Sequence, residues 1–200
     1  MADPSGGKDS GRMTTRTHTN PKQQKGFSLL EIVTLVAVVL LLSGLAFPRI
    51  TRYWQAYQLD SATQVLSSNL EVARYSAISK GYNIIVKFNA AAGSYEIFED
   101  KNENGIKDSG EITLGSYSLP NQVGFNGSGL QGPPSNPSGA VGDPITFSND
   151  KAVFNDSGKL NSGTGTIYMQ NAVGDASAIS FNFAGRMKVF RWVKSTNTWK

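Results

Sequence analysis

The chain has 200 residues, a formal net charge of +4 at pH 7, no cysteine and one histidine, His18. The absence of cysteine excludes disulfide bonds and a cysteine nucleophile. The sequence also lacks a Walker loop and a dinucleotide-binding fingerprint. No catalytic constellation is visible, so the sequence predicts a protein that is not an enzyme.

Residues 1–26 are polar and hold most of the positive charge. The charged residues of this segment are Lys8, Arg12, Arg16, Lys22 and Lys25 against Asp3 and Asp9. The basic residues exceed the acidic ones by three, so only +1 of the net charge of +4 belongs to residues 27–200. Positive charge directly before an apolar span holds that end of the chain in the cytoplasm. The pattern therefore predicts that residues 49–200 lie on the outer side of a membrane.

An almost uninterrupted apolar run covers residues 27–47. Its 21 residues would extend about 31 Å as a helix, which matches a hydrocarbon core of roughly 30 Å. The run contains one acid, Glu31, and a carboxylate within an apolar span is costly and therefore a functional candidate. The sequence predicts a membrane-spanning helix over residues 27–48, followed by a single domain of about 150 residues.

The start of this run, Lys-Gly-Phe-Ser-Leu-Leu-Glu, resembles the class III signal of type IV prepilins and type II secretion pseudopilins. The resemblance implies that a prepilin peptidase cuts between Gly26 and Phe27 and that the new amino group of Phe27 is methylated. It also implies that Glu31, then the fifth residue, attracts the amine of a neighbouring subunit during filament assembly. The alternative is an ordinary membrane anchor with an incidental acid.

The resemblance makes residues 1–26 a cytoplasmic leader, which is long for its kind. Translation could start at Met1 or at Met13, and the sequence leaves both open. His18 would be removed with the leader, which excludes histidine-based triads from the mature protein.

The helix is expected to continue to residue 80, because apolar residues recur at steps of three and four. These residues are Ile50, Tyr53, Trp54, Tyr57, Val65, Leu66, Leu70 and Ala73. Gly81 is a suitable C-terminal stop. We expect residues 49–80 to be amphipathic and the tyrosine and tryptophan residues to face a sheet, with a binding surface as the alternative.

Short segments rich in β-branched and aromatic residues follow, separated by Gly, Asn and Asp. They are residues 84–88, 95–99, 112–119, 145–147, 153–155, 166–170, 178–183 and 187–193. Short links between consecutive strands favour antiparallel pairing. Residues 120–144 hold five prolines and predict a long loop. The fold class is therefore α+β, with a long N-terminal helix packed on an antiparallel all-β head at residues 81–200.

This layout resembles the pilin-like GspH/FimT family, most clearly in FNDSGKLNSGTGTIYMQ and ISFNFAGRMKVFRW. Leu40 stands where many major pilins have a glycine, which favours a minor subunit. The resemblance implies a minor pilin or pseudopilin that initiates or caps a filament, either a type II secretion pseudopilus or a type IV pilus. It would be a single-pass protein of the bacterial inner membrane with a periplasmic head. Its partners would be the prepilin peptidase and other minor and major subunits.

Residues 100–111, DKNENGIKDSGE, have the ligand spacing of an EF-hand-type calcium loop. The expected ligands are Asp100, Asn102, Asn104, the Ile106 carbonyl, Asp108 and Glu111. Two features differ from such loops, because Lys107 occupies an apolar position and the flanking elements are strands. The alternative is a hairpin loop stabilised by Asx turns, with Gly105 at positive φ. A calcium-binding or adhesion module on a membrane anchor is the corresponding alternative function.

The C-terminal end is basic, with no acid after Asp175. The candidate DNA-binding residues are Arg186, Lys188, Arg191 and Lys194, with aromatic residues between them that could stack on bases. Residues 185–188 resemble the glycine-arginine motif with which some FimT-type minor pilins hold DNA during uptake, although lysine replaces its second arginine. The alternative is a solvated strand face, which the net charge of +1 for residues 27–200 favours.

Overall fold

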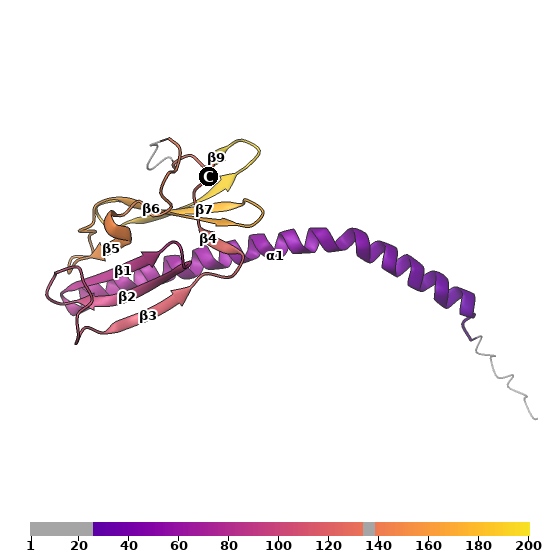
Figure 1. The fold of residues 1–200 in the computed structure, drawn as a ribbon, viewed down its shortest axis with the longest axis horizontal. Coiled ribbons are helices and arrows are strands. Elements are labelled where there is room, and N and C mark those ends of the chain that lie inside the picture. Colours follow the sequence, from indigo (N-terminus) through magenta and orange to yellow (C-terminus); the bar gives the residue numbers. More distant parts are fainter. Residues whose placement is uncertain (1–25, 134–138) are drawn as a thin grey trace, which may run out of the picture. The chain divides into compact units, whose positions relative to one another are not determined.

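The structure is a computed structural model that describes residues 26–133 and 139–200, apart from the side chains of residues 45–49 (Figure 1). The expected leader and His18 lie outside these residues, and Gly26 is the first described residue. The described chain divides into two compact units between Ser43 and Gly44.

One α-helix, α1, runs from Leu29 to Lys80. It ends where the sequence predicts, because Gly81 has a φ of 73° and its N–H donates to the Ala77 carbonyl at 2.9 Å. This left-handed geometry is the usual helix stop. Among the described residues, no helix has the combination of length and apolar character that crossing a membrane requires.

Two antiparallel sheets form the rest of the larger unit. The first sheet has the order β3 (Thr113–Ser118), β2 (Ser94–Asp100), β1 (Asn83–Asn89) and β5 (Lys151–Phe154). The second has the order β4 (Val123–Phe125), β6 (Gly165–Asn171), β7 (Ala176–Phe181), β8 (Met187–Val193) and β9 (Thr198–Trp199). The α+β class with an antiparallel head is confirmed.

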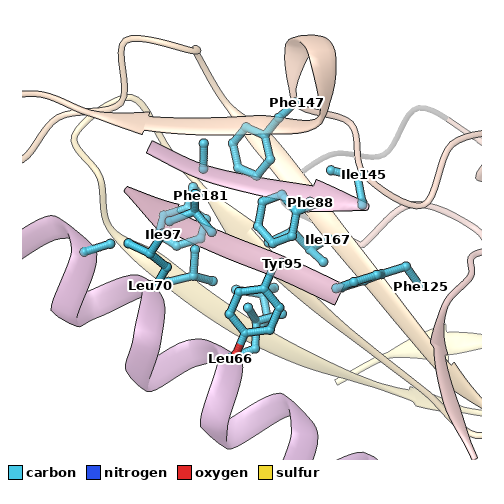
Figure 2. Close-up of a cluster of buried hydrophobic side chains, with 14 of the residues drawn as sticks. Leu66, Leu70, Phe88, Tyr95, Ile97, Phe125, Ile145, Phe147, Ile167 and Phe181 are labelled. Atoms are coloured by element: carbon cyan, nitrogen blue, oxygen red, sulfur yellow. The ribbon is translucent and has the colours of Figure 1, made fainter. Parts of the chain in front are cut away.

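The main hydrophobic core lies between the C-terminal part of α1 and the two sheets (Figure 2). The helix residues in it are spaced by three and four, as one helical face requires, and are Leu59, Ala62, Leu66, Leu70, Ala73 and Ala77. Phe88 and Ile97 come from the first sheet, and Ile167 and Phe181 from the second. The core therefore holds both sheets against one face of the helix.

A smaller core covers the other face of the second sheet. Its main residues are Tyr168, Ala178, Phe190 and Trp199, with Leu130 from the segment before the C-terminal strands. The Trp199 indole N–H donates to the carbonyl oxygen of Gln131. Part of the predicted loop at residues 120–144 is thus fixed on the sheet.

The strand prediction fails at three places. Residues 145–147 form a single bridge, Ile145 to Ile167, instead of a strand, because Pro144 has no N–H and the chain turns at once into a 3-10 turn, η1 (Ser148–Asp150). The short strands β4 and β9 were not expected. Each has two or three residues, too few for a recognisable alternation of side chains.

The expected packing of the tyrosine and tryptophan residues of α1 against a sheet is wrong. Ile50, Tyr53, Trp54 and Tyr57 are 64, 77, 59 and 57% exposed. A step of 100° per residue places them opposite the buried face around Leu66. The sequence pattern combined residues from two faces of the helix, and only Leu66, Leu70 and Ala73 of the predicted set belong to the core.

Candidate functional site

The N-terminal end of α1 brings together the residues of the predicted processing and assembly site. Phe27 precedes the helix and is 77% exposed. The Ser28 carbonyl accepts hydrogen bonds from the N–H groups of Glu31 and Ile32, at 3.0 and 3.1 Å. Glu31 lies in the first turn of α1, where the helix N-terminus adds partial positive charge. The peptide bond after Gly26 therefore lies in an open segment, one turn from the carboxylate.

The first four turns of α1 expose apolar side chains on every side. Leu29, Leu30, Val33, Leu35 and Leu41 are 56 to 82% exposed. Soluble monomers rarely expose contiguous apolar patches of more than a few hundred Å². A surface of this kind needs another apolar surface to cover it.

The loop after β2 is closed by its own side chains. Asp100 is 1% exposed, and its carboxylate accepts hydrogen bonds from the N–H groups of Asn104 and Gly105, at 3.0 and 3.1 Å. The φ of Gly105 is 75°, which a side chain would make unfavourable. The side-chain oxygens of Asn102 and Asn104 each accept from the N–H two residues on, at 3.3 and 2.8 Å, so the loop contains the Asx turns of the alternative interpretation.

The other expected calcium ligands hydrogen-bond to one another. The side-chain amides of Asn102 and Asn104 donate to one oxygen of Asp108, at 2.8 and 2.6 Å. The Glu111 carboxylate accepts from the N–H of Asp108 at 2.9 Å, and the N–H of Ile106 donates to Asn104. Within the described residues, no group of three His, Cys, Asp or Glu side chains could hold a metal ion. Calcium binding stays a prediction.

The four candidate DNA-binding residues are divided by the fold. Arg191 pairs with Asp60 of α1, and the ammonium of Lys194 lies 2.8 Å from the carboxylate of Asp175. Each of these two cations therefore has an acidic partner that partly neutralises it.

Arg186 and Lys188 share one pocket of about 390 Å³, which the hydroxyl-bearing residues Thr166 and Ser180 also line. Neither cation forms an ion pair within the described part of the chain. The Lys188 ammonium lies 4.9 Å from the centre of the Phe190 ring, a cation–π distance. The structure thus brings together two of the four candidate residues.

The turn before β8 positions Arg186 through two glycines. The side chain of Arg74 on α1 donates to the Gly158 carbonyl at 2.9 Å. Gly185 has a φ of 71°, and a Cβ atom on it would lie 2.2 Å from that same carbonyl oxygen. Asn182 accepts from the N–H of Arg186 at 2.9 Å. The glycine-arginine motif therefore has a structural reason, since only glycine fits beside Gly158.

A buried carboxylate that the sequence analysis missed joins the end of α1 to β2. Glu99 is 1% exposed, and its two oxygens lie 2.7 Å from the Lys80 ammonium and 3.0 Å from the Lys101 ammonium. The hydrogen bond from Lys80 lowers the pKa of Glu99 from 4.5 to about 2, although burial acts to raise it. Lys80 is also the basic residue of the last helical turn, where a cation is favourable.

The lowered pKa makes the stability of the head depend on pH. Because the folded-state pKa lies below the unfolded value, the pairing of Glu99 stabilises the fold above about pH 4.5, and this contribution is lost as the pH falls toward 2. Glu99→Gln should lower the free energy of unfolding at pH 7 by about 1–3 kcal/mol. Urea unfolding at pH 7 and pH 3 checks this. An equal loss of stability in the variant and the wild type between the two pH values would contradict the assignment.

Comparison with known proteins shows which family the chain is similar to. The model of a family described as "Type II transport protein GspH" matches residues 62–185, more than half of the chain. "Pilin-like protein PilA1" of Thermus thermophilus is 33% identical over 89 residues, which are 44% of this chain and 56% of that protein. A "Fimbrial protein" of Pseudomonas aeruginosa is 33% identical over 76 residues, 38% of this chain and 49% of that one. The chain spans about half the length of these curated relatives.

Two solved structures match about two thirds of the chain at low sequence identity. The type IV minor pilin FimU of Pseudomonas aeruginosa gives a TM-score of 0.44 and 17% identity, over 66% of this chain and 91% of that one. The minor pseudopilin EpsH of the Vibrio cholerae type 2 secretion system gives a TM-score of 0.45 and 9% identity, over 67% of this chain and 97% of that one.

Proposed function

Because this chain belongs to the GspH family of type II transport proteins, we propose that it initiates or caps a type IV filament as a minor subunit. The filament is either the pseudopilus of type II secretion or a type IV pilus. The N-terminal signal is common to both systems and does not distinguish them. The role is structural, not enzymatic.

The observation that carries the proposal is the apolar first part of α1 with its single acid. The side chains from Leu29 to Leu42 are exposed, and Glu31 is the one charged residue among them. Burial of apolar surface contributes roughly 25 cal/mol per Å², so this surface favours a bilayer before assembly and neighbouring helices afterwards. Residues 27–48 would therefore be both the inner-membrane anchor and the main contact between subunits, with the head in the periplasm.

Glu31 would set the position of each subunit along its neighbour. After cleavage, the amino group of Phe27 carries a positive charge. A carboxylate and an ammonium group in an apolar surrounding attract each other more strongly than in water. Only one axial offset between two parallel helices brings the amine of one subunit to the Glu31 of the other, so the pair selects that offset.

Removal of the leader is the first step that can be tested. We expect Gly26→Val to stay uncleaved, because the bulky side chain stands directly before the bond that the prepilin peptidase cuts. Mass spectrometry of the chain from cells with the peptidase should give an N-terminal methylated Phe27 for the wild type and the intact leader for the variant. Equal processing of both chains, or removal of the wild-type leader in cells that lack the peptidase, would contradict the proposal.

DNA capture is the competing function, and it rests on Arg186 and Lys188. Both line one pocket and lack acidic partners among the described residues. Binding through phosphates would weaken steeply with salt. The ion pairs of Arg191 and Lys194 leave two of the four candidate residues without an acidic partner among the described residues, which favours the structural role.

A further inference from the structure

The exposed aromatic residues of α1 are concentrated in two turns. Ile50, Tyr53, Trp54 and Tyr57, here called the aromatic collar, are all more than half exposed, and the rings of Trp54 and Tyr57 lie 5.9 Å apart. At 100° per residue these four side chains share the helix face opposite the core. Beyond Tyr57 the same face is mainly polar, with Ser61, Gln64, Ser68 and Glu71, and exposed apolar residues such as Val72 and Tyr75 are separate from the collar. The aromatic surface is thus a short band, not a seam along the whole helix.

Polar side chains lie directly beside the collar. Ile50 and Trp54 line a pocket of about 510 Å³ together with the amide side chains of Gln55, Gln58 and Gln122. The side-chain oxygens of Gln55 and Gln58 are buried and have no hydrogen-bond partner among the described residues. These turns therefore place amides that need polar partners next to the aromatic rings, and a surface with both apolar and polar groups suits the boundary between membrane and water.

The distance along the chain places the collar at the edge of the apolar run. The run ends at residue 47, so at about 1.5 Å per residue Ile50 follows about 5 Å, Trp54 about 10 Å and Tyr57 about 15 Å later along the helix axis. Side chains of a helix lean toward its N-terminus, which brings the Trp54 ring back toward the apolar run. The headgroup region extends roughly 5–8 Å beyond each side of the hydrocarbon core. Tryptophan and tyrosine are enriched in this region because a ring with one polar atom suits it.

We propose that the aromatic collar binds the headgroup layer of the phospholipid bilayer before the subunit enters a filament. This inference rests on the membrane anchor of the proposed function. The partner is the lipid surface, with Ile50, Tyr53 and Trp54 at headgroup level and Tyr57 at the outer edge of that layer. Because the collar lies on one side of the helix, it fixes the tilt and rotation with which the head is held above the membrane.

The test uses the full chain in vesicles of phosphatidylethanolamine and phosphatidylglycerol, with bromine on the acyl chains either near the headgroups or near the bilayer centre. Trp192 and Trp199 also fluoresce, so the fluorescence of Trp54 is obtained by subtracting the emission of Trp54→Phe from that of the wild type. We expect bromine near the headgroups to lower this difference signal about twofold or more, and bromine at the centre to have less effect.

A matched control places tryptophan on the same helix face outside the collar. Tyr75 is 63% exposed, so Trp54→Phe/Tyr75→Trp tests exposure without proximity to the membrane. Its added fluorescence should be unaffected by either bromine position. Equal quenching at both positions would overturn the proposal, as would an unquenched Trp54 in a chain that floats with the vesicles. A chain that does not float with them would instead overturn the membrane anchor, so the two failures are distinguishable.

Discussion

Replacing Glu31 with alanine is expected to leave the chain cleaved and membrane-inserted but to lower its recovery in sheared filaments at least about tenfold. A hydrogen bond between charged groups contributes about 1.5–3 kcal/mol, and about 1.4 kcal/mol is a factor of ten. Because alanine keeps the helix and its apolar surface, the variant would lose only the attraction between the Glu31 carboxylate and the amine of the neighbouring subunit. Immunoblots of the filament and membrane fractions measure it.

Two further variants separate the charge of Glu31 from its size and position. Glu31→Gln keeps the shape without the charge and should behave like alanine. Thr34→Ala removes a polar side chain of the same helix whose hydroxyl donates to the Glu31 carbonyl at 2.9 Å, and this variant should assemble normally. Wild-type recovery of Glu31→Gln would show that the carboxylate charge is not needed and would remove this role.

Gly185→Ala is expected to destabilise the head by about 2–4 kcal/mol, since it adds backbone strain to a steric clash. The φ of 71° is unfavourable for any residue with a Cβ atom, and the nearest atom to that Cβ would be the carbonyl oxygen of Gly158 at 2.2 Å. The opposing atom belongs to the backbone and is held by Arg74, so it cannot move away cheaply. Thermal and urea unfolding of the full chain in detergent measure the change.

Gly129→Ala is the matched control for this variant. Gly129 has a φ of 78°, but nothing lies within 4 Å of an added Cβ atom. It should therefore cost only the strain of the backbone, about 1–2 kcal/mol. Equal losses in the two variants would mean that the contact between Gly185 and Gly158 contributes nothing.

Local signals predicted much of the fold. Gly81 ends α1 because a glycine after a long helix can take the left-handed conformation. The predicted strand at residues 187–193 coincides with β8, which is rich in β-branched and aromatic residues. The α+β class followed from one long helical pattern before many short strand patterns.

The parts that were not predicted depend on contacts between distant residues. Glu99 reads as an ordinary strand residue, because nothing in the sequence shows that Lys80 at the end of the helix reaches it. The sequence indicated that Arg191 and Lys194 could bind phosphates, but the fold places Asp60 beside Arg191 and Asp175 beside Lys194. The aromatic collar was assigned to the core because spacing by three and four identifies a helical face but not the partner that the face contacts.

The measurement that tests the central claim most directly is the position and abundance of the wild-type chain in isolated filaments. Immunogold labelling of sheared filaments gives the position, and quantitative mass spectrometry gives the ratio to the main subunit. A minor subunit that initiates or caps the filament should label one end only, at a few copies per filament. Labelling along the whole length, or absence of the chain from filaments that form normally without it, would contradict the account.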